Sequence, residues 1–300
     1  MAVDLKLGIN LGFANNKYPE PHVWTRIVAE ELGLKYVQFV ADILNVFLPD
    51  EIIERQVEEI LENTQKYGLN ITSTFLSSFT RVNHFMHPDP EQRKVWLAWF
   101  KKFADISARM GAKMTGGHPG ILTFNDYDDP ARREEITLEG IKHWQELSWH
   151  CRELGMDCMI FEPMSIPREY ANTVEETKEL LARLNDGAGL PFRLCLDPGH
   201  APHPDDRDPY RWIRELGSVS PIVHIQQTEA GHSRHWPFTK AYNEIGIIHA
   251  EKVIEALEQS GAKEAELVFE IYHREAWSSE FSIVQDHKES VEYWRRYVKG

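Results

Sequence analysis

The sequence is poor in cysteine, with three among its 300 residues. Cys151, Cys158 and Cys195 form an odd set without regular spacing, which is typical of thiols in a reducing compartment and argues against a disulfide framework. The sequence also contains no run of eighteen apolar residues, and its first residues lack the basic and apolar segments of a signal peptide. We therefore expect a soluble, cytoplasmic protein that does not contact membranes.

Positive charge is scarce as well. Lys and Arg number 33 against 47 Asp and Glu, which gives a net charge of -14. Such a chain repels a phosphodiester backbone, and no cluster of basic residues provides a local exception, so we expect no nucleic-acid partner. Linkers rich in Ser and Gly and low-complexity segments are also missing. We therefore expect a single domain over residues 1–300.

The sequence instead contains eight apolar, strand-like segments that alternate with helical patterns. The predicted strands cover residues 5–12, 35–42, 69–76, 112–118, 156–162, 192–197, 221–227 and 266–272. Their starts lie about 30 to 45 residues apart, which is the spacing of consecutive βα units. Gly33, Gly68, Gly111 and Gly261 are expected to end the preceding helices in the left-handed conformation. We therefore predict the α/β class and, within it, a (β/α)8 TIM barrel.

The last four predicted strands carry a set of polar side chains near their carboxyl ends, where TIM barrels place their active sites. These are Glu162, Asp197, His224 and Glu270. Three carboxylates in an apolar setting repel one another and need raised pKa values, unless a cation neutralises them. A mixed set of oxygen and imidazole ligands suits Mn²⁺, Mg²⁺ or Co²⁺. The sequence therefore predicts one divalent metal ion held by these four residues.

This pattern of Glu162, Asp197-x-x-His200, His224 and Glu270 resembles the xylose isomerase-like TIM barrels, a group of sugar isomerases and epimerases. The resemblance covers essentially the whole chain, and it implies one Mn²⁺, Mg²⁺ or Co²⁺ ion that binds two neighbouring oxygens of a sugar substrate. It also implies that Glu162 and Glu270 are both metal ligands and the catalytic acid and base, and that His200 contacts a substrate hydroxyl. Within the group, the chain most resembles the D-apiose isomerase type.

The reaction expected from this resemblance interconverts an aldose and a ketose, such as D-apiose and D-apulose, by proton transfer through a metal-bound enediolate. Which glutamate acts first is open, and a hydride shift is another way to move the carbonyl. A 3-epimerase of the same family is the alternative. The epimerases place a substrate-binding Glu where Arg168 stands here and an Arg where Ala230 stands, with Arg234 a few positions later. These differences argue against epimerisation of ketohexoses.

Further residues are expected to contact the substrate. His118 lies at the end of the fourth predicted strand, at the mouth of the barrel. Phe13 and Trp277 follow the first and last strands and are candidates to line the pocket, with core packing as the alternative. Arg168 and Arg234 are candidates to bind a phosphate, although the lack of a Gly-rich phosphate-binding loop favours an unphosphorylated sugar.

A phosphodiesterase similar to endonuclease IV is the alternative from another class. Its multinuclear site would need further ligands, and His118, His200, His232 and His235 could supply them. The net charge and the lack of a basic DNA-facing stripe argue against it, and we expect His232 and His235 to be surface-loop residues. A barrel that binds sugars without catalysis is a third possibility, but it leaves the carboxylates at the metal unexplained.

We expect the protein to form a homodimer or a homotetramer.

Overall fold

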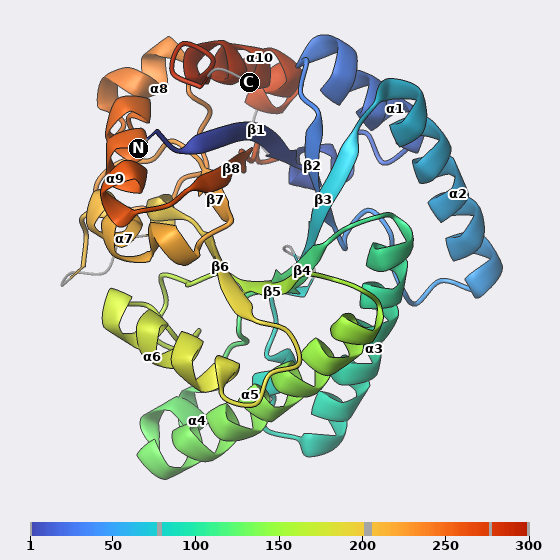
Figure 1. Cartoon of the computed structure of the whole chain (residues 1–300), viewed down its shortest axis with the longest axis vertical. Helices are drawn as coiled ribbons and strands as arrows, with labels where there is room; N and C mark the ends of the chain where they lie inside the picture. The colour runs from blue at the N-terminus through green and yellow to red at the C-terminus, as the bar shows by residue number, and fades with distance from the viewer. Residues whose placement is uncertain (1, 77–79, 201–205, 276–277, 299–300) are drawn as a thin grey trace.

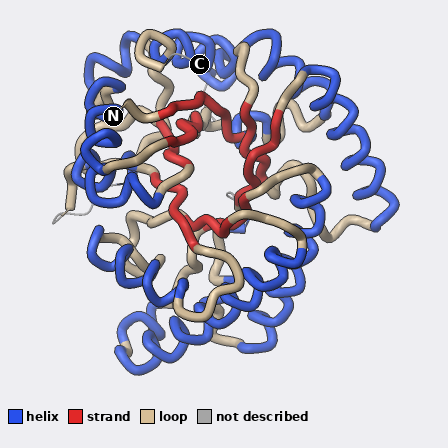
Figure 2. Tube along the Cα trace, in the orientation of Figure 1, coloured by secondary structure: helices blue, strands red, loops and turns tan. Residues whose placement is uncertain are grey.

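The computed structural model describes residues 2–76, 80–200, 206–275 and 278–298. Within these ranges, eight parallel strands pair in chain order and β1 pairs with β8, so the sheet closes into a barrel. The strands are β1 (Asp4–Asn10), β2 (Tyr36–Val40), β3 (Asn70–Phe75), β4 (Met114–Gly117), β5 (Cys158–Phe161), β6 (Phe192–Leu196), β7 (Ile222–Ile225) and β8 (Glu264–Phe269). Figure 2 shows them as a central ring surrounded by helices. The TIM barrel predicted from the sequence is confirmed.

Helices cover the outside of the barrel (Figure 1). The α-helices are α1 (Pro21–Arg26), α2 (Asp50–Tyr67), α3 (Pro90–Arg109), α4 (Phe124–Asp128), α5 (Pro130–Glu153), α6 (Val174–Asn185), α7 (Pro209–Leu216), α8 (Lys240–Ile245), α9 (Ala250–Ser260) and α10 (Ile283–Trp294). Shorter helical turns are η1 (Leu11–Ala14), η2 (Ile27–Glu31), η4 (His84–Met86), η5 (Pro198–His200), η6 (Gly217–Val219) and η7 (Ser278–Ser282). In the described ranges, no helix is long and apolar enough to span a bilayer.

The expected helix ends and thiols are also found. Gly33, Gly68, Gly111 and Gly261 all have a positive φ. Gly68 directly ends α2 and Gly261 directly ends α9, because a left-handed residue without a Cβ closes a helix at little steric cost. All three cysteines are free thiols, as the sequence predicted, and the structure shows that they are buried.

The alternation of side chains along the strands determines what points into the barrel. An apolar layer crosses its interior, formed by Phe75, Cys158, Ile160, Cys195, Ile222 and Val268. Because successive residues of a strand point to opposite faces, the residue two positions after a member of this layer also points inward. In β5 to β8 and at their ends, those positions are Glu162, Asp197, His224 and Glu270. The polar cluster therefore lies on top of the apolar layer, at the carboxyl end of the barrel.

Candidate active site

The structure brings together the four residues expected to bind a metal. Glu162, Asp197 and Glu270 directly follow β5, β6 and β8, and His224 lies within β7. All four are buried, and one ligand atom from each lies within 4.8 Å of the others. Their positions follow from strand alternation, so these side chains meet without any special loop structure.

His224 is the centre of this group. Its Nδ1 lies 3.2 Å from Glu162 Oε1 and 3.2 Å from Glu270 Oε2. Its Nε2 lies 2.7 Å from Gln38 Oε1, which also accepts a 2.7 Å hydrogen bond from Asn10 Nδ2. Gln38 is therefore an acceptor for the Nε2–H group of His224. The Nδ1 atom of His224 is left to face the carboxylates.

The electrostatics of the group fit a divalent cation. Burial and the neighbouring charge of Glu270 raise the pKa of Glu162, and burial raises the pKa of Asp197 to about 6. Burial also acts to raise the pKa of Glu270, but the charges of His224 and His235 outweigh it and lower that pKa. The Oε2 atom of Glu270 is buried and accepts no hydrogen bond within the described structure. A cation would balance these carboxylates, and three oxygens with one imidazole nitrogen are the donors that Mn²⁺, Mg²⁺ and Co²⁺ accept.

His200 lies beside this group, between two of its carboxylates. Its Nδ1 is 3.4 Å from Glu162 Oε1, and its Nε2 is 3.4 Å from Asp197 Oδ2. The Nδ1 atom is buried without a hydrogen-bond partner in the described part of the chain. The turn η5 accounts for this position, since it returns the chain over Asp197, whose Oδ1 accepts the backbone N–H of Gly199 at 2.7 Å.

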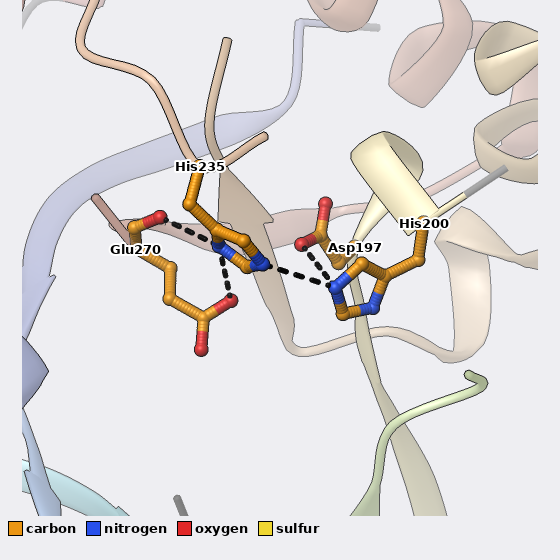
Figure 3. A group of neighbouring side chains, drawn as sticks. All are labelled: Asp197, His200, His235 and Glu270. Atoms are coloured by element: carbon orange, nitrogen blue, oxygen red, sulfur yellow. Dashed lines mark hydrogen bonds and ion pairs between the residues drawn. The ribbon is translucent and has the colours of Figure 1, made fainter. Parts of the chain in front are cut away.

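His235 also belongs to the site, and the expectation that it is a surface residue is wrong. Its Nε2 lies 3.4 Å from His200 Nε2, and its Nδ1 lies 3.1 Å from the backbone oxygen of Glu270. Figure 3 shows His235 next to Glu270 and His200 next to Asp197, with one ring nitrogen of each histidine directed toward the other. The loop reaches this position because Gln227 and Trp236 pair their backbones at the end of β7. That pairing has no signal in the local sequence. His232 is exposed, as expected.

Tyr272 is a further site residue that sequence reasoning missed. Its hydroxyl donates a 3.1 Å hydrogen bond to Glu270 Oε1, and burial raises its pKa well above the ordinary value, so it remains a donor. The ring lies against Gly12, where an added Cβ would come within 2.5 Å of a ring carbon. A side chain at position 12 would therefore displace Tyr272 and, through it, the carboxylate of Glu270.

The expected substrate contacts occupy different surroundings. His118 directly follows β4 and is buried, and it lies near the cluster because Gly117, the residue before it, accepts a 3.2 Å hydrogen bond from the backbone N–H of Glu162. Phe13 is buried with its ring 5.2 Å from that of His287, which matches the core-packing alternative. Trp277 lies outside the described residues.

The two predicted arginine contacts are held by other partners. Arg168 donates to the backbone oxygen of Leu122, and its guanidinium lies 4.4 Å from the ring centroid of Phe124. Arg234 binds Glu229 through its Nε atom at 2.9 Å. Within the described residues, neither arginine forms a hydrogen bond or ion pair with the four clustered residues, so their role in substrate binding stays a prediction.

The fold and the site define a barrel enzyme with a carboxylate and imidazole centre at the carboxyl ends of its strands. The profile of the family described as Xylose isomerase-like TIM barrel matches residues 27–297. The chain belongs to this family, and by class it is an isomerase or epimerase. This confirms the family resemblance seen in the sequence.

Three proteins illustrate the relationship. The chain is 34% identical over 299 residues to a D-erythrulose 1-phosphate 3-epimerase from Brucella abortus (strain 2308), covering 98% of this chain and 96% of the relative. A protein from Rhodospirillum rubrum ATCC 11170, provisionally assigned as a xylose isomerase, superposes with a TM-score of 0.88 at 28% identity, covering 97% and 99% of the two chains. D-psicose 3-epimerase from Clostridium cellulolyticum H10, solved with D-tagatose, superposes with a TM-score of 0.71 at 17% identity. The superposition covers 98% of this chain and 100% of the epimerase, which shows a shared fold.

Proposed function

We propose that this chain is a divalent-metal-dependent 3-epimerase of a short ketose phosphate. The observation that carries the proposal is the approach of Glu162 and Glu270 to one point, each 3.2 Å from His224 Nδ1. The relative with 34% identity is a 3-epimerase of D-erythrulose 1-phosphate, and it covers nearly the whole chain. The proposal therefore takes the epimerase alternative in place of the aldose–ketose isomerase favoured from the sequence.

Two carboxylates around one centre suit inversion of a carbon. Epimerisation at C3 of a ketose removes the proton on one face of the carbon next to the carbonyl and returns a proton to the opposite face. Glu162 and Glu270 come from β5 and β8, so a sugar between them has a carboxylate on either side. One takes the proton as general base while the other, protonated, delivers one as general acid. Moving a carbonyl between C1 and C2 needs only one of them.

Glu162, Asp197, His224 and Glu270 would hold the metal ion. When bound, a divalent cation supplies the positive charge that polarises the carbonyl and makes the neighbouring C–H more acidic. Tyr272 orients the carboxylate of Glu270 through its hydroxyl. His200 and His235 lie beside the four residues and orient the sugar through hydrogen bonds to its oxygens.

The phosphate requires a cation of its own, because a site with three carboxylates repels a second anion. Arg81 is suited to this role. After burial, the positive charge of Arg81 is the largest cause that lowers the pKa of His118, which follows β4. Glu169 holds the Arg81 guanidinium through both of its carboxylate oxygens. The side chain of Glu169 is fully buried while that of Arg81 is 40% exposed, so the arginine is the accessible member of the pair.

The test compares D-erythrulose 1-phosphate with D-erythrulose, D-apiose and ketohexoses, each with Mn²⁺ or Mg²⁺ and after chelation. Because the two erythrulose phosphates are mirror images, loss of circular dichroism at the carbonyl band reports epimerisation, and deuterium uptake at C3 from D₂O reports proton exchange. We expect both with the phosphate ester and neither after chelation. An aldose–ketose product from D-apiose would instead support the isomerase, and cleavage of an abasic-site duplex would support a phosphodiesterase.

The variant Arg81→Gln tests whether Arg81 binds the phosphate group and not the sugar. If Arg81 binds the phosphate, this change raises KM for D-erythrulose 1-phosphate by at least about tenfold, since it removes a charge-assisted contact. The much slower reaction of the unphosphorylated sugar should be unchanged. Arg109→Gln is the matched control, because Arg109 also pairs with both carboxylate oxygens of a glutamate, Glu54, and is 41% exposed, but lies at the end of α3. Equal losses with both sugars would contradict the assignment.

A further inference from the structure

Two buried histidines lie next to each other at the carboxyl end of β4. His84, in η4, and His118, directly after β4, have ring centroids 5.1 Å apart and ring planes 14° apart. His84 Nε2 lies 3.2 Å from His118 Nδ1. His84 has no exposed surface and His118 is 4% exposed, so both rings are shielded from water.

His84 stands in an aromatic environment that would accept an apolar residue more readily. The rings of Phe85, Trp96, Phe100 and Trp144 surround it in edge contacts, with centroids 5.4 to 6.2 Å away. Its φ of 31° is in the region that non-glycine residues seldom adopt. A buried polar ring and a strained backbone are both unfavourable, and such strain is typical of functional positions.

The hydrogen bonds fix the protons on both rings. The backbone N–H of Phe85 donates to His84 Nδ1 at 2.7 Å, so this nitrogen carries no proton. A neutral imidazole has one N–H group, which for His84 must then be at Nε2. That group donates to His118 Nδ1, which must accept it. The proton of His118 is therefore at Nε2.

The Nε2–H group of His118 has no partner of its own. The atom is buried, and it makes no hydrogen bond with any described residue. Burial, followed by the charges of Arg81 and His200, lowers the pKa of His118 to about 3, so the ring is neutral at physiological pH. A buried donor without an acceptor is costly unless a ligand completes it.

We propose that His118 is a fixed, uncharged hydrogen-bond donor to an acceptor oxygen of the sugar, and that His84 is a positioning residue that sets its tautomer. The inference rests on the proposed function for the identity of the ligand as a ketose phosphate. The order of donation runs from Phe85 N–H to His84, from His84 to His118 and from His118 to the substrate. A donor fixed in this way stabilises negative charge on the oxygen without reorganising during the reaction.

The first experiment reads the tautomers directly. Nitrogen-15 NMR of the labelled, metal-loaded protein, through couplings between ring protons and nitrogens, should show a bare Nδ1 and a protonated Nε2 on both histidines from pH 5 to 9. D-Erythrulose 1-phosphate should shift the Nε2–H resonance of His118. A protonated Nδ1 on His118, or no shift with any sugar of the panel, would overturn the proposal.

The second experiment uses variants. His84→Phe fits the aromatic environment but donates no hydrogen bond, and His84→Asn tolerates a positive φ without reaching His118. Either should leave metal content unchanged, mix the tautomers of His118 and lower kcat/KM about tenfold, while His118→Phe should lower it about 10²-fold. His143→Gln is the matched control, because His143 stacks on Phe85, one of the rings around His84. This variant should change neither the tautomer of His118 nor kcat/KM.

The outcomes separate this inference from the proposed function. If the wild-type protein epimerises no sugar but a ketose phosphate still shifts His118 Nε2–H, the proposed reaction fails and the donor role stands. If the protein is active and His84→Asn retains both the tautomer and the full kcat/KM, the reaction stands and the positioning role of His84 is rejected.

Discussion

Gln38 Oε1 lies 2.7 Å from His224 Nε2, and this contact determines which nitrogen of His224 faces the carboxylates. Asn10 Nδ2 donates to the same oxygen at 2.7 Å and holds the amide in this orientation. A partner of this kind fixes the tautomer of a metal-binding histidine and increases its basicity.

We therefore predict that Gln38→Leu lowers metal affinity by about 10- to 100-fold without unfolding the barrel. Competition with a chelator, measured on the purified protein, gives the affinity, and circular dichroism checks the fold. Gln38→Glu retains an acceptor oxygen at the same position and should keep an affinity close to that of the wild type. An unchanged affinity in Gln38→Leu would show that Gln38 does not orient His224.

Asp197 and Glu270 should differ when each carboxylate becomes an amide. Asp197→Asn removes a charged oxygen from the expected ligand set, so metal binding weakens and excess Mn²⁺ restores part of the activity. Glu270→Gln keeps the shape but removes the basic carboxylate, so kcat should fall by at least ~10²-fold even at saturating Mn²⁺. Proton exchange with solvent should disappear with it. Normal turnover of Glu270→Gln at saturating Mn²⁺ would contradict the proposal that the two glutamates act on opposite faces of C3.

His200 should act on the substrate and not hold the metal. Its ring lies beside the four clustered residues, 3.4 Å from carboxylate oxygens of both Glu162 and Asp197. We predict that His200→Ala retains the metal content of the wild type and raises KM or lowers kcat. Elemental analysis after gel filtration measures the first, and steady-state kinetics the second. The control variant His232→Ala, at an exposed position, should change neither the metal content nor the kinetic constants. Loss of metal from His200→Ala would make His200 a ligand.

The fold and the four clustered residues could be predicted because they depend on local sequence. Apolar runs mark the strands, alternation decides which side chains point inward, and parallel strands bring their carboxyl ends to one edge. Glu162 and Glu270 follow from these rules alone. Gln38, His84 and His235 do not, because their roles arise from contacts between distant segments. Gln38, for example, is 186 residues from His224, and a polar residue within an apolar strand gives no sign of its partner.

Glu266 lies at the opposite end of the barrel from the site and links stability to pH. It points inward two residues before Val268, and its carboxylate accepts a 3.1 Å hydrogen bond from Thr72 Oγ1. Burial raises its pKa from 4.5 to about 7, against the smaller opposing effects of Thr72 and Lys6. The folded protein therefore keeps a proton on Glu266 at pH values where the unfolded chain has released it.

The sign of the effect follows from this difference in bound protons. The stabilising contribution of protonated Glu266 is complete below about pH 4.5 and is lost as the pH rises to about 7. A shift of this size corresponds to about 3 kcal/mol. Glu266→Gln does not titrate. We therefore predict that its free energy of unfolding, relative to that of the wild type, increases by about 2 to 3 kcal/mol between pH 5 and pH 8.

Urea denaturation of both proteins at the two pH values measures this difference. Comparing the variant with the wild type at each pH cancels the titration of Glu162, Asp197 and Glu270, which is common to both proteins. Glu264→Gln is the matched control, because the side chain of Glu264 lies at the same end of the same strand but is 73% exposed. Its free energy of unfolding should follow that of the wild type. If Glu266→Gln does the same, then Glu266 is ionised in the folded protein throughout this range, and burial does not hold its proton.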